Sequence, residues 1–199
     1  MSAAPPLERR VCVYCASSQS CAPVYHDAAW RLGGVLADAG FTVVYGGGAT
    51  GSMGAVANGA LARGGRVVGV LPRFMAELEW GHDRLSELHL VDDMRTRKHE
   101  MLSRSQGVVA LPGGSGTLEE LLEAISLKRL GIFLGPIVLV NTKGFFDPLL
   151  ALLGNAVAER FMDERHLAMW QVVAEPEHVP AELASAPAWD ESARRFARP

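Results

Sequence analysis

The run VVALPGGSGTLEELLEAI at residues 108–125 constrains the fold of this chain more than any other feature. A short apolar stretch typical of a buried strand ends in a glycine-rich turn, and a helical pattern begins directly after it. The first turn of such a helix carries unpaired amide donors and about half a positive charge, so it attracts phosphates. Three glycines let the main chain approach an anion closely: Gly113, Gly114 and Gly116. With Glu119 and Glu120 in the helix, the run predicts a phosphate site beside an acid.

Apolar runs alternate with helical patterns along the rest of the chain. We expect strands at residues 10–15, 41–45, 66–70, 87–91, 107–111 and 136–141, with a weaker one at 171–173. We expect helices around residues 23–39, 52–63, 93–105, 117–131 and 145–160. This alternation predicts an α/β fold: a single-domain, Rossmann-like, doubly wound parallel sheet flanked by helices, with ligands at the carboxyl ends of the strands. We expect the domain at 10–184, after an N-terminal extension at 1–9 and before an Ala-, Arg- and Pro-rich segment at 185–199 whose composition is typical of a flexible tail.

Length and charge exclude several classes of protein. A chain of 199 residues is long enough for one well-buried domain. A formal net charge of −3 leaves no basic stripe for a nucleic-acid backbone, so we expect no nucleic-acid partner. The first ten residues lack the apolar core of a signal peptide, and the apolar stretch at 131–140 is too short to span a bilayer. We therefore expect a cytoplasmic protein with no membrane partner.

The cysteines at one end of the chain invite a redox or metal interpretation. Cys12 and Cys15 form a single CxxC pair. Because they fall in an expected strand, side chains three residues apart point to opposite faces. No second CxxC or suitably spaced histidine pair accompanies them. We expect small buried thiols and no metal site.

A second glycine turn, VVYGGGATGSMG at residues 43–54, follows the second expected strand. A dinucleotide fingerprint is weak here because no acidic residue stands about 20 positions on, and no Gly-Lys-Ser/Thr follows to make a P-loop. The alternative is a tight turn between strand and helix with no ligand. We favour a ligand-lining turn that brings Gly47 and Gly48 to the same crevice as the first glycine turn.

A structural explanation competes for Glu120. Thr117 and Glu120 have the spacing of a capping box. In that motif the hydroxyl and the carboxylate each accept a hydrogen bond from the backbone amide of the other residue, at the start of a helix. That pattern alone leaves the three glycines and the proline before it unexplained. On the residues alone, the capping box and the reactive acid are about equally supported.

The segment MRTRKHEM at residues 94–101 carries the third candidate group. It is expected to open a helix capped by Asp92 or Asp93. Arg97 and Lys98 oppose the helix dipole near its start, so they need an acid or an anion nearby. Taken alone, this segment favours a solvated basic face paired with Glu100.

These three segments, in this order, resemble the lonely-guy (LOG) family of cytokinin riboside 5′-monophosphate phosphoribohydrolases. The family pattern PGGxGTxxE is intact at residues 112–120, the YGGGxxGxMG turn matches residues 45–54, and the family's Arg-Lys pair matches Arg97 and Lys98. The likeness extends from residue 11 to about residue 173. No residue supports a pyridoxal phosphate site, although such sequences have been called lysine decarboxylases.

The resemblance implies hydrolysis of the N-glycosidic bond of an N6-modified adenosine 5′-monophosphate, giving free base and ribose 5-phosphate. It implies Arg97 and Glu120 as catalytic residues, a nucleoside 5′-monophosphate as substrate, a homodimer, and neither cofactor nor metal. It assigns substrate or phosphate contacts to a longer set of residues: Glu79, Met94, Lys98, Gly113, Gly114, Ser115, Gly116, Thr117, Leu118, Glu119 and Ser126.

Two departures from the family pattern concern the preferred substituent on N6. Arg95 stands where a histidine is frequent, and the common Thr-Trp-x-Gln-Leu-Gly run reads SLKRLG from Ser126. A general AMP nucleosidase is therefore one alternative. A carrier that binds a nucleotide or a phosphorylated cofactor without reacting is the other, although a carrier needs no acid beside its cradle.

Overall fold

The computed structural model describes residues 8–78, 80–195 and 197. Its strands are β1 (Arg9–Tyr14), β2 (Phe41–Tyr45), β3 (Val67–Pro72), β4 (Glu87–Val91), β5 (Gly107–Ala110), β6 (Ile137–Val140) and β7 (Gln171–Val173). The α-helices are α1 (Pro23–Asp38), α2 (Gly51–Ala62), α3 (Arg73–Glu77), α4 (Met94–Ser103), α5 (Ser115–Arg129), α6 (Asp147–Ala158) and α7 (Val179–Ser185). Each strand and helix that the sequence predicts is present, with ends shifted by a few residues. The short helices α3 and α7 were not predicted.

The described strands form one parallel sheet in the order β4-β3-β2-β1-β5-β6-β7. The direction of winding reverses between β1 and β5, where Val11 pairs with Val43 on one side and with Gly107 on the other. In a doubly wound sheet this switch point opens a crevice at the carboxyl ends of the strands. The loops after β1 and β5 border that crevice.

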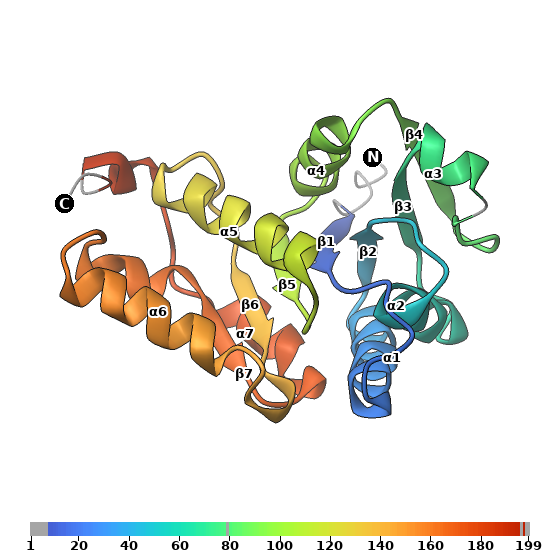
Figure 1. Cartoon of the computed structure of the whole chain (residues 1–199), viewed down its shortest axis with the longest axis horizontal. Coiled ribbons are helices and arrows are strands. Elements are labelled where there is room, and N and C mark those ends of the chain that lie inside the picture. Colours follow the sequence, from blue (N-terminus) through green and yellow to red (C-terminus); the bar gives the residue numbers. More distant parts are fainter. Residues whose placement is uncertain (1–7, 79, 196, 198–199) are drawn as a thin grey trace, which may run out of the picture.

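Apolar side chains fill both faces of the sheet, as expected for strands buried on two sides. One cluster packs under α4 and α5 and includes Cys12, Tyr14 and Met101, and the other packs under α1 and α2. Figure 1 shows α1 and α2 together at the lower right and α5 crossing in front of β5 and β6. Cys12 and Cys15 belong to opposite clusters as free, buried thiols, which confirms the structural interpretation of the CxxC pair.

The 3-10 helix at Glu191–Arg195 lies beyond α7 and contacts α5. Just before it, Trp189 donates from its indole Nε1 to the carbonyl of Lys128 over 2.8 Å. None of the helices in the described part of the chain is both long and apolar enough to cross a membrane.

Candidate active site

Arg97 is the centre of the site at the switch point. It lies in the first turn of α4, where Asp93 caps the helix by accepting a hydrogen bond of 2.7 Å from the amide of Thr96. The guanidinium group donates to three acceptors at 3.1 Å: the carbonyl of Val70 in β3, the carbonyl of Gly46 after β2, and Oε1 of Glu120 in α5. Three separate elements therefore fix this buried side chain.

Gly46 is the position where the second glycine turn serves Arg97. A Cβ atom on Gly46 would lie 1.7 Å from Nη2 of Arg97, so a side chain there would displace the guanidinium group from its three acceptors. The next residue, Gly47, has a φ of 78°, which favours glycine. The turn therefore brings a backbone acceptor to Arg97, a function that the sequence pattern alone did not reveal.

Glu120 is the buried acid of the site, with a side chain only 6% exposed. Burial raises the pKa of its carboxyl to about 7, and the guanidinium of Arg97 opposes that rise. A carboxyl with a pKa near neutral holds both protonation states in useful amounts at pH 7, as general acid–base catalysis requires.

The capping-box explanation of Glu120 is wrong. Helix α5 begins at Ser115 with Gly114 as its N-cap, two residues before the expected start, and no described side chain caps it. Thr117 lies in the first turn of the helix and is buried. It packs against Gly113 so closely that a Cβ atom added to Gly113 would lie 2.1 Å from Oγ1 of Thr117. Because Gly114 is the N-cap, Thr117 and Glu120 do not form a capping box, and the Glu120 carboxylate pairs with Arg97 instead.

The start of α5 presents a bare surface to the crevice. Gly114, Ser115 and Gly116 are exposed, and a Cβ atom added at Gly114 or Gly116 would meet nothing within 4 Å. Packing within the chain therefore does not require glycine at these two positions. Glycine at both positions leaves the amides of residues 115–117 open to the approach of an anion.

Lys98 stands beside the buried pair. Its ammonium group forms ion pairs with Glu119 and, at 2.9 Å, with Glu123 Oε2. These hydrogen bonds raise the pKa of Lys98. The expected pairing of the basic face with Glu100 is wrong, because Glu100 pairs with Arg104, the C-cap residue of α4.

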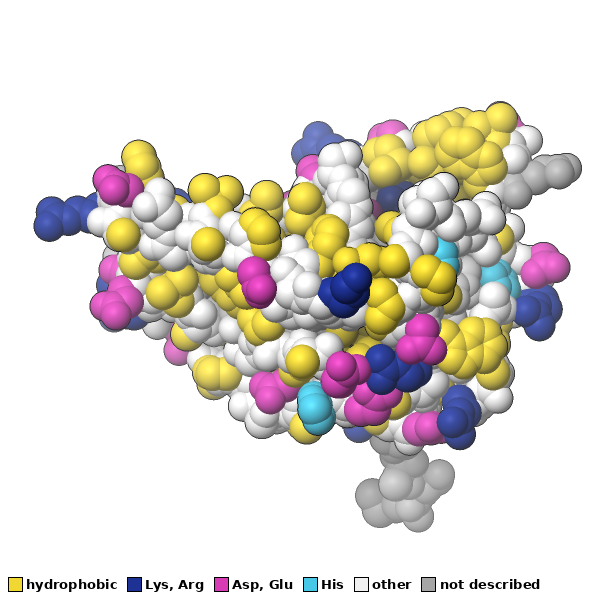
Figure 2. All heavy atoms as spheres, turned by 60° about the horizontal axis from the view of Figure 1, so that its bottom comes forward, with side chains coloured by type: hydrophobic (Ala, Val, Ile, Leu, Met, Phe, Trp, Pro, Cys, Tyr) yellow, Lys and Arg dark blue, Asp and Glu magenta, His cyan; other side chains and the backbone are white. Residues whose placement is uncertain are grey.

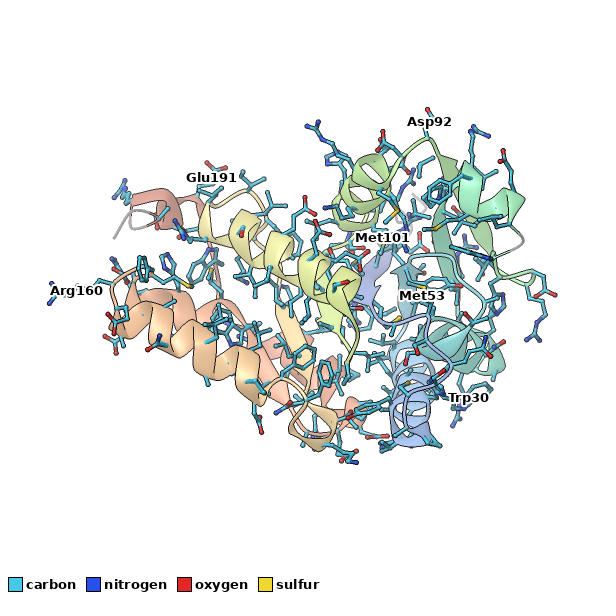
Figure 3. The ribbon with its side chains drawn as sticks, viewed as in Figure 1. Trp30, Met53, Asp92, Met101, Arg160 and Glu191 are labelled. Atoms are coloured by element: carbon cyan, nitrogen blue, oxygen red, sulfur yellow. The ribbon has the colours of Figure 1, made fainter. Side chains whose placement is uncertain are left out.

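A cavity of about 400 Å³ opens next to Arg97. The glycine turn, the loop after β1 and the segment after α3 surround it. Its apolar lining includes Met53, Leu71, Met75 and Trp80, and Gly48 lies at its wall. Figure 3 labels Met53, whose side chain lies against the glycine turn: a Cβ atom on Gly48 would come within 2.8 Å of its Sδ. The combination of flat and flexible apolar groups with one arginine suits an aromatic base.

The remaining expected contact residues differ in their burial and in their position along α4 and α5. Met94 begins α4 and is 40% exposed, and Leu118 packs against the core. Ser126 is exposed farther along α5 and donates to the carbonyl of Leu122 over 2.7 Å. The structure therefore does not bring Ser126 to the Arg97–Glu120 pair within this chain. Glu79 lies outside the described residues.

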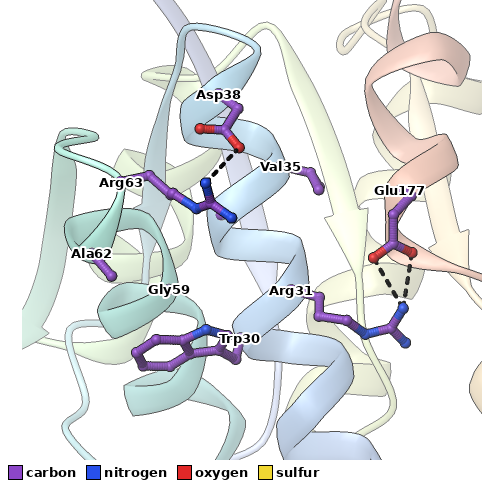
Figure 4. Close-up of a pocket in the computed structure, with 9 residues that line it drawn as sticks. Trp30, Arg31, Val35, Asp38, Gly59, Ala62, Arg63 and Glu177 are labelled. Atoms are coloured by element: carbon purple, nitrogen blue, oxygen red, sulfur yellow. Dashed lines mark hydrogen bonds and ion pairs between the residues drawn. The ribbon is translucent and has the colours of Figure 1, made fainter.

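A second hollow, of about 380 Å³, lies between α1 and α2 and carries no comparable chemistry (Figure 4). Its arginines already have partners: Arg31 pairs with Glu177 at 2.9 Å, and Arg63 lies 3.8 Å from Asp38. Among the described residues, no three His, Cys, Asp or Glu side chains gather as a metal site.

The fold and the site define a Rossmann-like α/β protein in which an open helix start adjoins a buried carboxylate–guanidinium pair. Residues 53–183 match the family model described as "Possible lysine decarboxylase". The chain is 44% identical over 153 residues to the probable cytokinin riboside 5′-monophosphate phosphoribohydrolase LOGL1 of Oryza sativa subsp. japonica, covering 77% of this chain and 69% of that protein. It is 43% identical over 156 residues to cytokinin riboside 5′-monophosphate phosphoribohydrolase LOG of the same organism, covering 78% and 64%. The chain therefore belongs to the LOG family, and it spans about two thirds of the length of these relatives.

The solved structures agree on the fold. The molybdenum cofactor binding protein from Rippkaea orientalis superposes with a TM-score of 0.70 at 21% identity, covering 91% of this chain and 98% of that one. A likeness at that identity shows the Rossmann-like architecture alone.

Proposed function

We propose that this protein hydrolyses the C1′–N9 bond of an adenosine 5′-monophosphate carrying a substituent on N6. The products are the free base, a cytokinin, and ribose 5-phosphate. The observation that carries this proposal is the buried Arg97–Glu120 pair directly beside the open first turn of α5. The named activity of the relatives, at 43–44% identity, supports the same reaction.

The phosphate is the anchor of the substrate in this proposal. It binds the amides of Ser115, Gly116 and Thr117, where the helix dipole favours negative charge. This contact is remote from the bond that breaks, and its binding energy holds the sugar in a reactive position. The nucleoside without its phosphate should then be a much poorer substrate.

Glu120 acts at the sugar. As the C1′–N9 bond breaks, positive charge develops on the ribose and negative charge on the departing purine. The ionised carboxylate stabilises the oxocarbenium-like centre and takes a proton from the water that attacks C1′. Arg97 holds the carboxylate in position, and its charge favours departure of the purine, which leaves with a proton from solvent.

The experiment is a product assay with two substrates, AMP and N6-isopentenyl-AMP. We expect free base and ribose 5-phosphate in equal amounts, with the N6-modified substrate preferred. Equal rates on both substrates would indicate a general AMP nucleosidase. Binding of both nucleotides without any product would indicate a carrier and would contradict the proposal.

We also propose a cytoplasmic homodimer with no nucleic-acid partner. The net charge of −3 supports the last point. Exposed apolar side chains on α5 and the turn after it, including Leu122, Leu130 and Ile132, give a surface that a second copy can cover. Light scattering on the purified protein tests this, and a monomer at micromolar concentration would contradict it.

A further inference from the structure

The segment after α3 folds back over the glycine turn that follows β2. The amide of Ala49 donates to the carbonyl of Trp80 over 3.1 Å, and the amide of His82 donates to the carbonyl of Gly47 over 2.9 Å. Between them, Gly48 and Gly81 form an isolated antiparallel bridge. We call residues 80–82 the strap. Its backbone is tied to the turn that also supplies the acceptor for Arg97.

The far end of the strap is anchored by a buried histidine. The imidazole Nε2 of His82 lies 3.3 Å from Oδ1 of Asn58 in α2, and its Nδ1 accepts from the amide of Arg84 over 3.1 Å. At the other end, the amide of Trp80 donates to the carbonyl of Met75 in α3 over 3.2 Å. The amide and the carbonyl of Trp80 itself are therefore both hydrogen-bonded.

The strap holds an indole at the mouth of the cavity beside Arg97. Trp80 lines that cavity and yet is 54% exposed. Phe74 and Leu78, on α3 and in the turn after it, are also about half exposed. Figure 2 shows apolar side chains gathered over this part of the molecule, at its upper right. A fixed, solvent-exposed apolar group next to a polar catalytic pair is typical of a ligand-binding surface.

We propose that Trp80 determines specificity by packing against the purine base and its N6 substituent. This inference rests on the proposed function. A base whose glycosidic bond lies at Glu120 and Arg97 enters the cavity that Arg97 lines, and Trp80 forms another wall of that cavity. The six-membered ring carries N6 on the side away from N9, so the substituent extends toward the mouth. An apolar substituent there adds contact area with the indole.

A groove between α4 and α5 is the competing location for the substituent. It encloses about 700 Å³ and is lined by Leu127, Ile132 and Phe133, with Arg95 at its edge. It contains two of the positions that depart from the family pattern, Arg95 and Leu127. It does not include Arg97 or the glycine turn in its lining, and we therefore favour the cavity under Trp80.

The test compares kcat/KM for N6-isopentenyl-AMP with kcat/KM for AMP in three variants. Trp80→Ala should lower this ratio roughly tenfold, because stacking on the base is lost for both substrates and cancels, whereas apolar contact with the N6 substituent is lost for only one of them. The change should appear in KM, with kcat within a few-fold of the wild type. Trp80→Phe should restore most of the ratio. Leu127→Trp, which fills the competing groove, should leave the ratio unchanged. An unchanged ratio in Trp80→Ala, or a changed ratio in Leu127→Trp alone, would overturn the inference.

Binding without turnover separates this inference from the proposed function. In the Glu120→Gln background, N6-isopentenyl-AMP should quench tryptophan fluorescence, and an added Trp80→Phe change should remove that quench while the melting temperature is retained. A Trp80-dependent quench with no hydrolysis by the unmodified protein would refute the reaction and keep the binding role. Normal hydrolysis with a quench that survives Trp80→Phe would refute the binding role alone.

Discussion

Nη1 of Arg97 lies 3.1 Å from Oε1 of Glu120, and the two side chains are each only 6% exposed. Buried ion pairs of this kind contribute little net stability, because desolvation offsets their attraction. Here the other two guanidinium contacts go to backbone carbonyls on β3 and on the glycine turn after β2. Contacts to three separate segments thereby hold the pair in one geometry, which suits the catalytic role that we propose for it.

Glu120→Gln should abolish most turnover while the nucleotide still binds. The amide cannot take a proton from water or neutralise charge on the ribose, so we expect a loss of about 100-fold or more in kcat. Single-turnover kinetics and a direct binding measurement check this. Glu123→Gln is the matched control, because that carboxylate lies on the same helix, is exposed and pairs with Lys98 at 2.9 Å, and it should lose less than about tenfold. Turnover close to the wild type in Glu120→Gln would remove this residue from the mechanism.

Arg97→Lys should also lose about 100-fold or more in kcat, because one ammonium group cannot reach all three acceptors. Arg97→Ala additionally leaves a buried carboxylate unpaired, a change that typically costs about 3–5 kcal/mol of stability. Without the positive charge, the pKa of Glu120 should rise further. The kinetic pH profile of Arg97→Lys should therefore stay closer to the wild type than that of Arg97→Ala. Identical profiles in both variants would show that Arg97 does not tune the acid.

The pH dependence of kcat/KM should follow the ionisation of Glu120. In the proposed mechanism the ionised carboxylate is the reactive form, and burial raises the pKa of this group to about 7. The rate should therefore rise about tenfold per pH unit at low pH and level off above pH 7. The substrate phosphate also titrates, with a pKa of about 6, so the residual activity of Glu120→Gln serves as the reference. An inflection near pH 7 that persists in Glu120→Gln would contradict the assignment.

Gly114→Ala should weaken phosphate binding without affecting the fold. The backbone of Gly114 has a φ of −82°, and a Cβ atom there meets no protein atom within 4 Å. We expect an unchanged melting temperature and a KM for AMP raised about tenfold or more, corresponding to one lost hydrogen bond to a charged group. Gly154→Ala, in α6 and equally free of contacts, is the control and should leave KM unchanged. Wild-type KM in Gly114→Ala would argue that the anion binds elsewhere.

The burial of Lys128 predicts a second pH effect, in this case on the free energy of unfolding. This residue is 1% exposed, and burial lowers the pKa of its ammonium group to about 8 from 10.5. The unfolded chain therefore binds more protons than the folded one between these values, so the free energy of unfolding should rise as pH increases from 8 to 10.5. The gain should be at most about 3 kcal/mol relative to Lys128→Met, measured by urea unfolding. Equal pH slopes in both proteins would mean that Lys128 is not desolvated.

Much of this architecture could be predicted from the sequence because its periodicity is strong. The alternation of apolar runs with helical patterns located the strands, including the weak one at Gln171–Val173. An N-cap at Asp92 or Asp93 was also predicted, since an Asp before a helical segment is a local signal, and the structure places the cap at Asp93. Local signals of this kind depend only on neighbouring residues.

The pairing of charged side chains could not be predicted in the same way. Arg97 meets Val70, Gly46 and Glu120 from three distant segments, and only the sheet order brings these together. The sequence offered Glu100 as a partner because it is close along the chain. The capping-box and reactive-acid explanations of Glu120 differ in where the helix starts. The capping box needs Thr117 at the N-cap, whereas α5 begins at Ser115 with Gly114 as its N-cap. Trp80 was missed because the strap depends on main-chain hydrogen bonds to a glycine turn, which leave no side-chain pattern.

A crystal structure of the Glu120→Gln variant with N6-isopentenyl-AMP tests the central claim most directly. The account predicts the phosphate against the amides of residues 115–117, C1′ of the ribose next to the side chain at position 120, and the purine in the cavity beside Arg97. A nucleotide bound with its phosphate away from the start of α5, or with C1′ out of reach of position 120, would contradict it.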